Sequence, residues 1–251
     1  MAGHSKWANI KRQKARVDAK KGKTFAQLSR AIIVATRTGI PDPAGNFQLR
    51  TAIDKAKAAG IPNENIERAI AIGAGTFADN DANFEAIRYE GYGPAGVAIL
   101  IEALTDNRNR TAADLRSAFS KNGGNLGETG CVSWMFEQKG VVILEGKIEE
   151  DVLLEASVEG EAQTYEITED GAEVFTEVPN LEKLNQTLQT KKLPVSEAEI
   201  RWIAKNSVEV TDAEQGRSLL KLIDTLEDLD DVQNVTANFD LAEDLISLSL
   251  A

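Results

Sequence analysis

The stretch FEAIRYEGYGPAGVAILIEAL, residues 84–104, separates two regions of different periodicity. Its first part, FEAIRYE, alternates between apolar and polar residues, as a half-buried strand does, and VAILIEAL (97–104) is apolar enough for a fully buried strand. Before this stretch the apolar residues recur at helical spacing, and after it strand and helix patterns are mixed. The sequence therefore predicts an α+β multidomain chain that begins with a helical part.

The segment GYGPAG (91–96) between the two strands fits the pattern G-x-G-x-x-G of dinucleotide-binding folds. That function requires a helix directly after the glycines, so that its N-terminus holds the pyrophosphate. Here a strand follows, and Pro94 lies inside the motif. We therefore interpret the segment as a hairpin loop between antiparallel strands.

Helical patterns fill the region before residue 78. Ser5 is a candidate N-cap for the first helix, which Gly22 is expected to end, and Thr24 with Gln27 forms a capping box for the second. The four helices are predicted over residues 5–21, 24–38, 46–59 and 62–73. Together they form a small helical bundle, which the polar linker GAGTFADNDAN (73–83) separates from the rest.

Mixed patterns fill the region after residue 104. A helix is expected to begin at Thr111, CVSWMF (131–136) reads as a strand, and Gln138-Lys139-Gly140 as a turn. Further strands are predicted over 141–145, 163–168, 172–178, 199–204 and 232–238, and further helices over 149–159, 180–190 and 212–228. From Val141 the series is β-α-β-β-α-β, a ferredoxin-like order.

The first sheet is incomplete without the C-terminal helix and strand. We therefore expect one α+β domain to be inserted in another. The predicted domains are a basic helical bundle (1–78), a discontinuous α+β domain (79–137 and 207–251) and an inserted ferredoxin-like α+β domain (138–206).

Charge is distributed very unevenly along the chain. The whole carries a formal −12, but residues 1–78 hold 14 Lys and Arg against 5 Asp and Glu, a net +9, which leaves −21 for the remainder. Within MAGHSKWANIKRQKARVDAKKGKTF (1–25) eight basic residues face one acid, Asp18. Such clustering indicates a polyanion partner, nucleic acid above all, while the alternative is a set of solvated surface lysines.

The candidate phosphate contacts in this basic segment are Lys6, Lys11, Arg12, Lys14, Arg16, Lys20, Lys21 and Lys23. Trp7 lies among them, and it either stacks on a base or anchors its helix to the bundle.

A second candidate anion site is the sequence DNRNRT, residues 106–111, which joins a buried strand to a helix. It places Arg108 and Arg110 at a helix N-terminus, where anions are favoured. The alternative is capping by Asn109 or Thr111 together with ion pairs between the arginines and acidic residues. Residues that are candidates for secondary loop contacts are Tyr92, Gly93, Asn107, Asn109, Asn122, Gly123, Gly124 and Asn125. The sequence leaves open whether the glycine-rich loop 122–130 lies beside DNRNRT.

The sequence contains few of the residues that usually form catalytic or metal-binding sites. His4 and Cys131 are the single histidine and cysteine, which excludes the common zinc sites, and no phosphate-binding P-loop motif occurs. Acid pairs such as Asp230-Asp231 read as solvated charges. We expect no enzymatic activity, no cofactor and no metal.

The sequence contains no apolar run of transmembrane length and no secretory signal pattern. The single cysteine fits a reducing compartment, so we expect a cytoplasmic protein without membrane contact. The sequence leaves the oligomeric state open.

Three segments together resemble the YebC family: AGHSKWANIKRQKARVDAKKGKTF near the start, YEGYGPAGVAILIEALTDNRNRTAADLRSAFSKNGGNLG in the middle, and LLKLIDTLEDLDDVQNV near the end. The resemblance covers nearly the whole chain, although the loop reads GYGPAG where the family usually has GYGPGG. It implies a helical domain plus two α+β domains, one of them ferredoxin-like and inserted in the other, and no enzymatic activity.

The resemblance also implies a function. Bacterial members are described as probable transcriptional regulators, and mitochondrial relatives as translational activators of cytochrome c oxidase subunit I. The first hypothesis is therefore a DNA-binding regulator of gene expression. The alternative is a ribosome-associated translation factor that binds ribosomal RNA and eases the synthesis of proline-rich stretches. Phosphate is common to both ligands, so the basic segment does not separate them.

Overall fold

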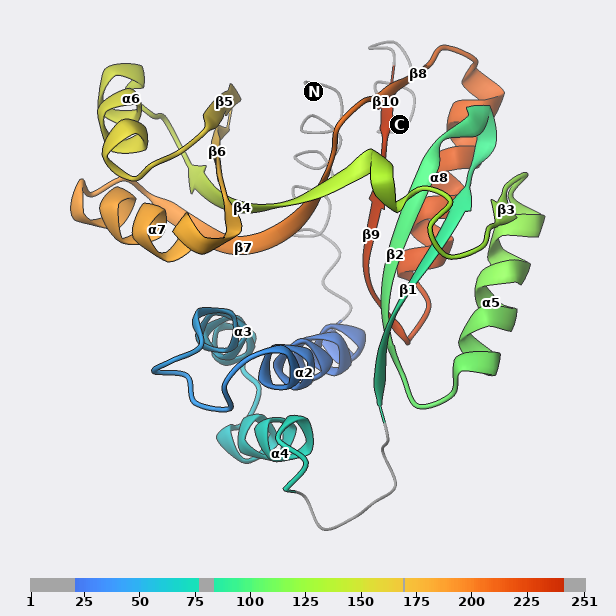
Figure 1. Ribbon diagram of the computed structural model, residues 1–251, viewed down its shortest axis with the longest axis horizontal. Helices are drawn as coiled ribbons and strands as arrows, with labels where there is room; N and C mark the ends of the chain where they lie inside the picture. Colours follow the sequence, from blue (N-terminus) through green and yellow to red (C-terminus); the bar gives the residue numbers. More distant parts are fainter. Residues whose placement is uncertain (1–20, 77–83, 169, 242–251) are drawn as a thin grey trace. The chain divides into compact units, whose positions relative to one another are not determined.

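The computed structural model describes residues 21–76, 84–168 and 170–241 (Figure 1). The chain divides into a larger unit, Met1–Phe136 with Ala204–Ala251, and a smaller one, Glu137–Ile203, which is continuous in sequence. The predicted division into three domains is finer than this and stays a prediction. The predicted helix over 5–21 lies outside the described residues, apart from its last position.

Three helices make up the described N-terminal part: α2 (Lys21–Thr38), α3 (Phe47–Ala58) and α4 (Asn63–Gly73). Their apolar faces meet in one core that contains Ile32, Leu49 and Ile66. Asn46 joins two of the helices, because its side chain caps α3 by accepting from the Leu49 N–H and also donates to the carbonyl of Ala35 in the last turn of α2. The predicted start and end of α3 are thus confirmed to within a residue.

The predicted boundary at Gly22 is wrong, and so is a helix start at Thr24. Both residues lie inside α2, which already begins at Lys21. An interior glycine costs a helix about 1 kcal/mol relative to alanine. The packing of α2 against α3 and α4 outweighs that cost, as tertiary packing generally does for helices in proteins.

The larger unit also contains a four-stranded sheet in the order β3-β1-β2-β9, and all of its pairs are antiparallel. Its strands are β1 (Glu85–Tyr92), β2 (Ala98–Thr105), β3 (Asn125–Leu126) and β9 (Val232–Ala237). The C-terminal strand therefore completes the sheet, as the sequence indicated. Two helices, α5 (Arg108–Lys121) and α8 (Ala213–Glu227), bury Phe119, Leu219 and Leu222 in the same core as Ile99 and Ile101 of β2. A short parallel pair, β8 (Val208–Val210) with β10 (Phe239–Leu241), was missed.

The hairpin interpretation of GYGPAG is confirmed, because β1 and β2 pair directly on either side of it. The glycines serve close packing. A Cβ on Gly91 would lie 2.7 Å from the Phe119 ring, and one on Gly93 would lie 3.0 Å from Ile99 and Leu219. The loop ends in the turn η1 (Pro94–Gly96), where Ala95 has a left-handed backbone with φ of 59°.

The smaller unit follows the β-α-β-β-α-β series that the sequence predicted. Its elements are β4 (Phe136–Glu145), α6 (Glu150–Glu159), β5 (Thr164–Thr168), β6 (Gly171–Thr176), the turn η3 (Val178–Asn180), α7 (Leu181–Thr190) and β7 (Val195–Ala204). The strand order β5-β6-β4-β7 is that of a split β-α-β fold, the ferredoxin-like arrangement.

Three predicted local features in the mixed region are wrong. The predicted turn at 138–140 is absent, because β4 runs through these residues. Gly140 instead allows close packing of Leu181, since a Cβ added to Gly140 would lie 2.9 Å from the Leu181 Cβ. The strand over 131–136 is a loop with the 3-10 turn η2 (Ser133–Met135). Helix α5 begins at Arg108 rather than Thr111, because Asn107 is its N-cap.

None of the helices in the described ranges is long and apolar enough to cross a membrane.

Replacement of Ala95 by glycine should stabilise the protein. A left-handed backbone costs a residue with a Cβ about 1–2 kcal/mol, and the greater freedom of glycine in the unfolded chain takes back about 0.4–1 kcal/mol. We expect Ala95→Gly to raise the unfolding free energy by about 0.5–1 kcal/mol, measured by urea denaturation. Ala59→Gly is the control, since Ala59 has φ of −76° and the same exchange there should destabilise. A loss of stability in both variants would contradict the expectation.

Candidate nucleic-acid interface

Most of the predicted phosphate contacts of the basic segment lie outside the described residues, and Trp7 does as well. These are Lys6, Lys11, Arg12, Lys14, Arg16 and Lys20. The backbone of Lys21 and Lys23 forms the first turn of α2. The structure therefore shows where the basic segment joins the fold, at the N-terminus of α2.

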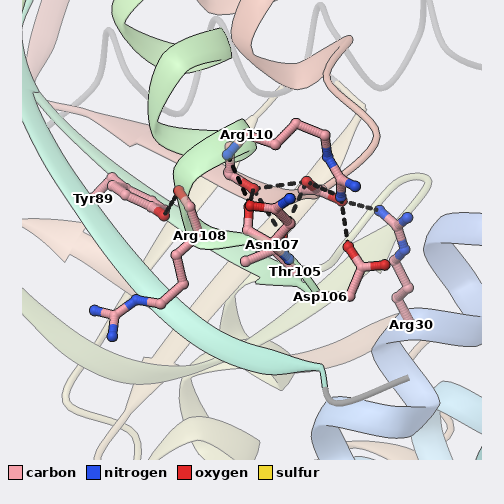
Figure 2. A network of polar contacts seen from close by, with 9 residues as sticks. Arg30, Tyr89, Thr105, Asp106, Asn107, Arg108 and Arg110 are labelled. Carbon is pink, nitrogen blue, oxygen red and sulfur yellow. Dashed lines mark hydrogen bonds and ion pairs between the residues drawn. The ribbon is translucent and has the colours of Figure 1, made fainter. Parts of the chain in front are cut away.

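The second candidate site, DNRNRT, is built around a carboxylate from elsewhere in the chain, that of Asp231. Figure 2 shows Thr105, Arg110 and Arg30 turned toward one another around this site. The hydroxyls of Thr111 and Thr105 lie 2.7 Å and 3.1 Å from its Oδ2, and Nη2 of Arg110 donates to the same oxygen at 2.9 Å. The backbone carbonyl of Asp231 accepts from the Leu104 N–H at 2.8 Å. One residue thus holds the end of β2 and the start of α5 together.

The Asp231 side chain is 7% exposed. Burial alone would raise the pKa of its carboxyl, but the hydrogen bonds from Arg110, Thr111 and Thr105 outweigh burial and hold the pKa below its usual value. The interpretation of Asp230-Asp231 as a solvated pair is therefore wrong for Asp231, while Asp230 is exposed. These two neighbouring acids thus have different environments: Asp231, directly before β9, is buried, and Asp230 faces solvent.

The two arginines of DNRNRT differ in their surroundings. The guanidinium of Arg110 contacts both Asp106, at 2.7 Å, and Asp231, and these two carboxylates raise its pKa. The side chain of Arg108 is 66% exposed and comes within 3.7 Å of Glu85, an exposed carboxylate. Arg110 is thus engaged in holding the loop, whereas Arg108 presents its charge to solvent.

The cap of α5 also differs from the alternatives that the sequence offered. Asn107 accepts from the Arg110 N–H through its side chain at 3.1 Å, so neither Asn109 nor Thr111 is the N-cap. Figure 2 shows Tyr89 beside this turn, where its hydroxyl donates to the Arg108 carbonyl at 3.3 Å. The helix N-terminus is consequently occupied by the protein's own groups.

Asp231 also receives a second arginine, from α2. Nη1 of Arg30 lies 3.4 Å from Oδ1 of Asp231, an ion pair without hydrogen-bond geometry, and its guanidinium lies 5.9 Å from the centre of the Phe84 ring. Leu104, at the end of β2, belongs to the core of the three helices. The helix that carries the end of the basic segment is therefore tied to the DNRNRT loop by a charge contact and by apolar packing.

The candidate loop contacts at the glycine-rich end form a separate group. Tyr92 pairs with Asn125 across β1 and β3, and a Cβ on Gly124 would lie 2.7 Å from the Tyr92 carbonyl. The side chain of Asn122 turns back to the Ala118 carbonyl. Gly93 is next to Tyr92, and Gly123, with φ of 76°, follows Asn122. These residues gather around the C-terminal end of α5.

The glycine-rich loop does not lie beside DNRNRT. The two sit at opposite ends of α5, and a helix of 14 residues is about 20 Å long. Asn107, Asn109, Arg108 and Arg110 form one candidate surface, and the loop residues around Tyr92 form another.

Sequence reasoning missed Arg30, Asp231, Glu90 and Trp134. Glu90 is 3% exposed and binds three backbone N–H groups, and Trp134 is 62% exposed. Glu90 falls on a polar position of the alternating stretch FEAIRYE, where an exposed side chain is expected, so none of these four residues carries a local signal in the sequence.

Removal of the Asp231 charge should destabilise the larger unit. Asp231→Asn leaves Arg30 and Arg110 without their shared carboxylate, and we expect the unfolding free energy to fall by about 1–3 kcal/mol, a range discounted because Arg110 is half-exposed. The measurement is urea denaturation at pH 7. The exposed neighbour provides the control, since Asp230→Asn should change stability by less than about 0.5 kcal/mol. Equal effects of the two substitutions would contradict the role given to Asp231.

Acid should weaken the fold through Asp231 and Glu90. Both carboxyls have a pKa below its usual value in the folded state, so the unfolded chain binds protons first as the pH falls below about 5. Their stabilisation is present at neutral pH and is lost as the pH falls toward the folded-state pKa values. The unfolding free energy from urea denaturation between pH 7 and pH 3 should fall less steeply in Asp231→Asn than in the wild type, by up to about 1.4 kcal/mol per pH unit. Parallel pH profiles for this variant and the wild type would contradict a contribution of Asp231 to the loss of stability in acid.

Comparison with known proteins gives matches over nearly the whole chain. Residues 5–76 match the TACO1/YebC protein N-terminal domain, and residues 84–239 match the TACO1/YebC second and third domain. A probable transcriptional regulatory protein of Gloeothece citriformis is 80% identical over 255 residues, and one of Trichormus variabilis is 76% identical over 252; each alignment covers 100% of both chains.

The fold also matches a solved structure. The crystal structure of a conserved hypothetical protein from Aquifex aeolicus is 45% identical, with a TM-score of 0.83, and the alignment covers 91% of this chain and 94% of that one. The domain matches, the identities and the mixed α+β fold agree with one another. This chain belongs to the TACO1/YebC family.

Proposed function

We propose that this protein is a non-enzymatic regulator of gene expression that binds duplex DNA through its basic segment, residues 1–25. The observation that carries the proposal is the charge separation: a net +9 over residues 1–78 against −21 over the rest. An acidic body is repelled by a polyanion, so only the basic end of the molecule approaches it. The names of the bacterial relatives, probable transcriptional regulatory proteins, support a regulatory role.

The contacts of α2 support a continuous binding surface. Lys21, at the start of α2, precedes Arg30 by nine residues, or about 14 Å of helix. Arg30 contacts Asp231, and Asp231 also binds Arg110 and Thr111 of the DNRNRT segment that carries Arg108. B-DNA carries one charge per about 1.7 Å of its axis, so a segment of about 14 Å presents about eight phosphates. We therefore expect one DNA duplex, with both strands counted, to extend along α2 from the end of the basic segment to Arg30.

Arg110 contributes in a different way. Its guanidinium is already paired with Asp106 and Asp231, so a phosphate would have to compete with two carboxylates for it. We assign Arg108 to phosphate contact and Arg110 to holding the DNRNRT loop in place. Backbone contacts of this kind position a protein on DNA without reading its sequence, so we expect weak discrimination between sequences.

Binding should depend steeply on salt, and the basic segment should supply that dependence. In Lys11→Ala/Arg12→Ala/Lys14→Ala the slope of log affinity against log salt should fall by up to about 2.7, or about 0.9 per lost phosphate contact. Fluorescence anisotropy with a labelled duplex at several salt concentrations measures the slope. The matched control is Lys147→Ala/Arg217→Ala/Lys221→Ala, which removes the same charges from exposed positions outside the basic segment and should keep the wild-type slope.

Two results would overturn the proposal. A flat salt dependence in the wild type would exclude phosphate as the main contact. Retention of the wild type by ribosomes in co-sedimentation, lost in the Lys11/Arg12/Lys14 variant and without duplex binding at physiological salt, would assign the basic segment to ribosomal RNA instead.

A further inference from the structure

Trp134 is an exposed aromatic ring on a loop that the proposed function does not use. It lies in the turn η2, and its side chain is among the most exposed large apolar groups of the described residues, at 62%. Its indole N–H donates to the Cys131 carbonyl at 3.2 Å, and the Tyr92 hydroxyl donates to the same carbonyl at 3.0 Å. The polar edge of the ring is therefore bound to its own loop, and the exposed remainder is carbon.

A buried carboxylate fixes this loop. Glu90 of β1 accepts the N–H groups of Gly130 at 2.8 Å, Val132 at 2.7 Å and Ser133 at 2.8 Å. Burial opposes the charge of Glu90, but these three donors outweigh it and hold its pKa below the usual value. A charged group at 3% exposure is thus used to give a surface loop one defined conformation.

A ring held in this way suits stacking. A fixed aromatic side chain loses little conformational entropy on binding, and a nucleobase is a flat partner that requires no hydrogen bond from the ring. A cation stands at the same turn, since Nζ of Lys205, an exposed residue, donates to the Trp134 carbonyl at 3.1 Å. Proteins bind single-stranded nucleic acid by combining aromatic side chains with basic residues, and this turn carries one of each.

We propose that Trp134 is a stacking platform for an unpaired nucleobase, with Lys205 placed for the neighbouring phosphate. The inference rests on the proposed binding of nucleic acid and extends it from paired to unpaired bases, because a base inside a duplex does not offer its face to a protein ring. Strand β1 connects the two surfaces: Glu85 contacts Arg108 at one end, and Tyr92 contacts Cys131 at the other, about 23 Å away.

The test compares Trp134→Ala and Trp134→Phe on two probes, a labelled single-stranded oligothymidine and a duplex of the same length. We expect Trp134→Ala to weaken oligothymidine binding about 5- to 150-fold, the loss typical of one stacked base, and to leave duplex binding nearly unchanged. Trp134→Phe keeps an aromatic face but lacks the indole N–H, so it should retain most of the affinity. The control is Val158→Ala, another exposed apolar truncation, which should change neither affinity.

Several results would overturn the platform. Unchanged oligothymidine binding in Trp134→Ala would show that Trp134 is not a stacking platform. Duplex binding by the wild type would in that case still support the proposed function. Equal losses in the alanine and phenylalanine variants would assign the effect to loop position instead of stacking. A change in sedimentation of Trp134→Ala without a change in affinity would assign the ring to a protein contact. A wild type that bound neither probe would reject the proposed function and the platform together.

Discussion

The carboxylate of Asp231 is the contact at which three parts of the larger unit meet. It receives Thr105 from the end of β2, Thr111 and Arg110 from the start of α5, and Arg30 from α2. A buried carboxylate is costly unless its partners satisfy it, and here the partners come from separate elements. The same carboxylate therefore joins both α5 and α2 to the end of β2.

Glu90 does at one end of β1 what Asp231 does near the other. Each is a buried acid whose oxygens hold neighbouring segments in place: Asp231 binds the end of β2 and the start of α5, and Glu90 binds the loop around η2. Around Asp231 the result is the DNRNRT loop with Arg108 exposed, and around Glu90 it is the turn that carries Trp134. The two proposed contact surfaces thus have the same construction: a buried carboxylate fixes the local backbone, and an exposed side chain, Arg108 or Trp134, lies on the segment it fixes.

Where prediction from the sequence failed, the competing force can be named. Gly140 is interpreted as a turn residue from the sequence, but it lies within a strand where the close packing of Leu181 leaves no room for a side chain. Leu181 is distant in the sequence, so the residues around Gly140 do not indicate this contact. CVSWMF has the composition of a strand, but the N–H groups of Val132 and Ser133 bind Glu90 instead of a neighbouring strand. The start of α5 moved to Arg108 because Asn107, rather than Asn109 or Thr111, caps the helix.

The sequence by itself determined the helical and strand periodicities, the β-α-β-β-α-β series, the charge separation and the family, because each of these is written in residues that are close together in the chain. Only the tertiary structure decided that Asp231 is buried while Asp230 is exposed, that Arg110 is held by two carboxylates while Arg108 lies exposed beside Glu85, and that Trp134 faces solvent. The physical reason is sequence distance. Asp231 meets Thr105 across 126 positions and Arg110 across 121, and such contacts form only when the sheet brings distant segments together.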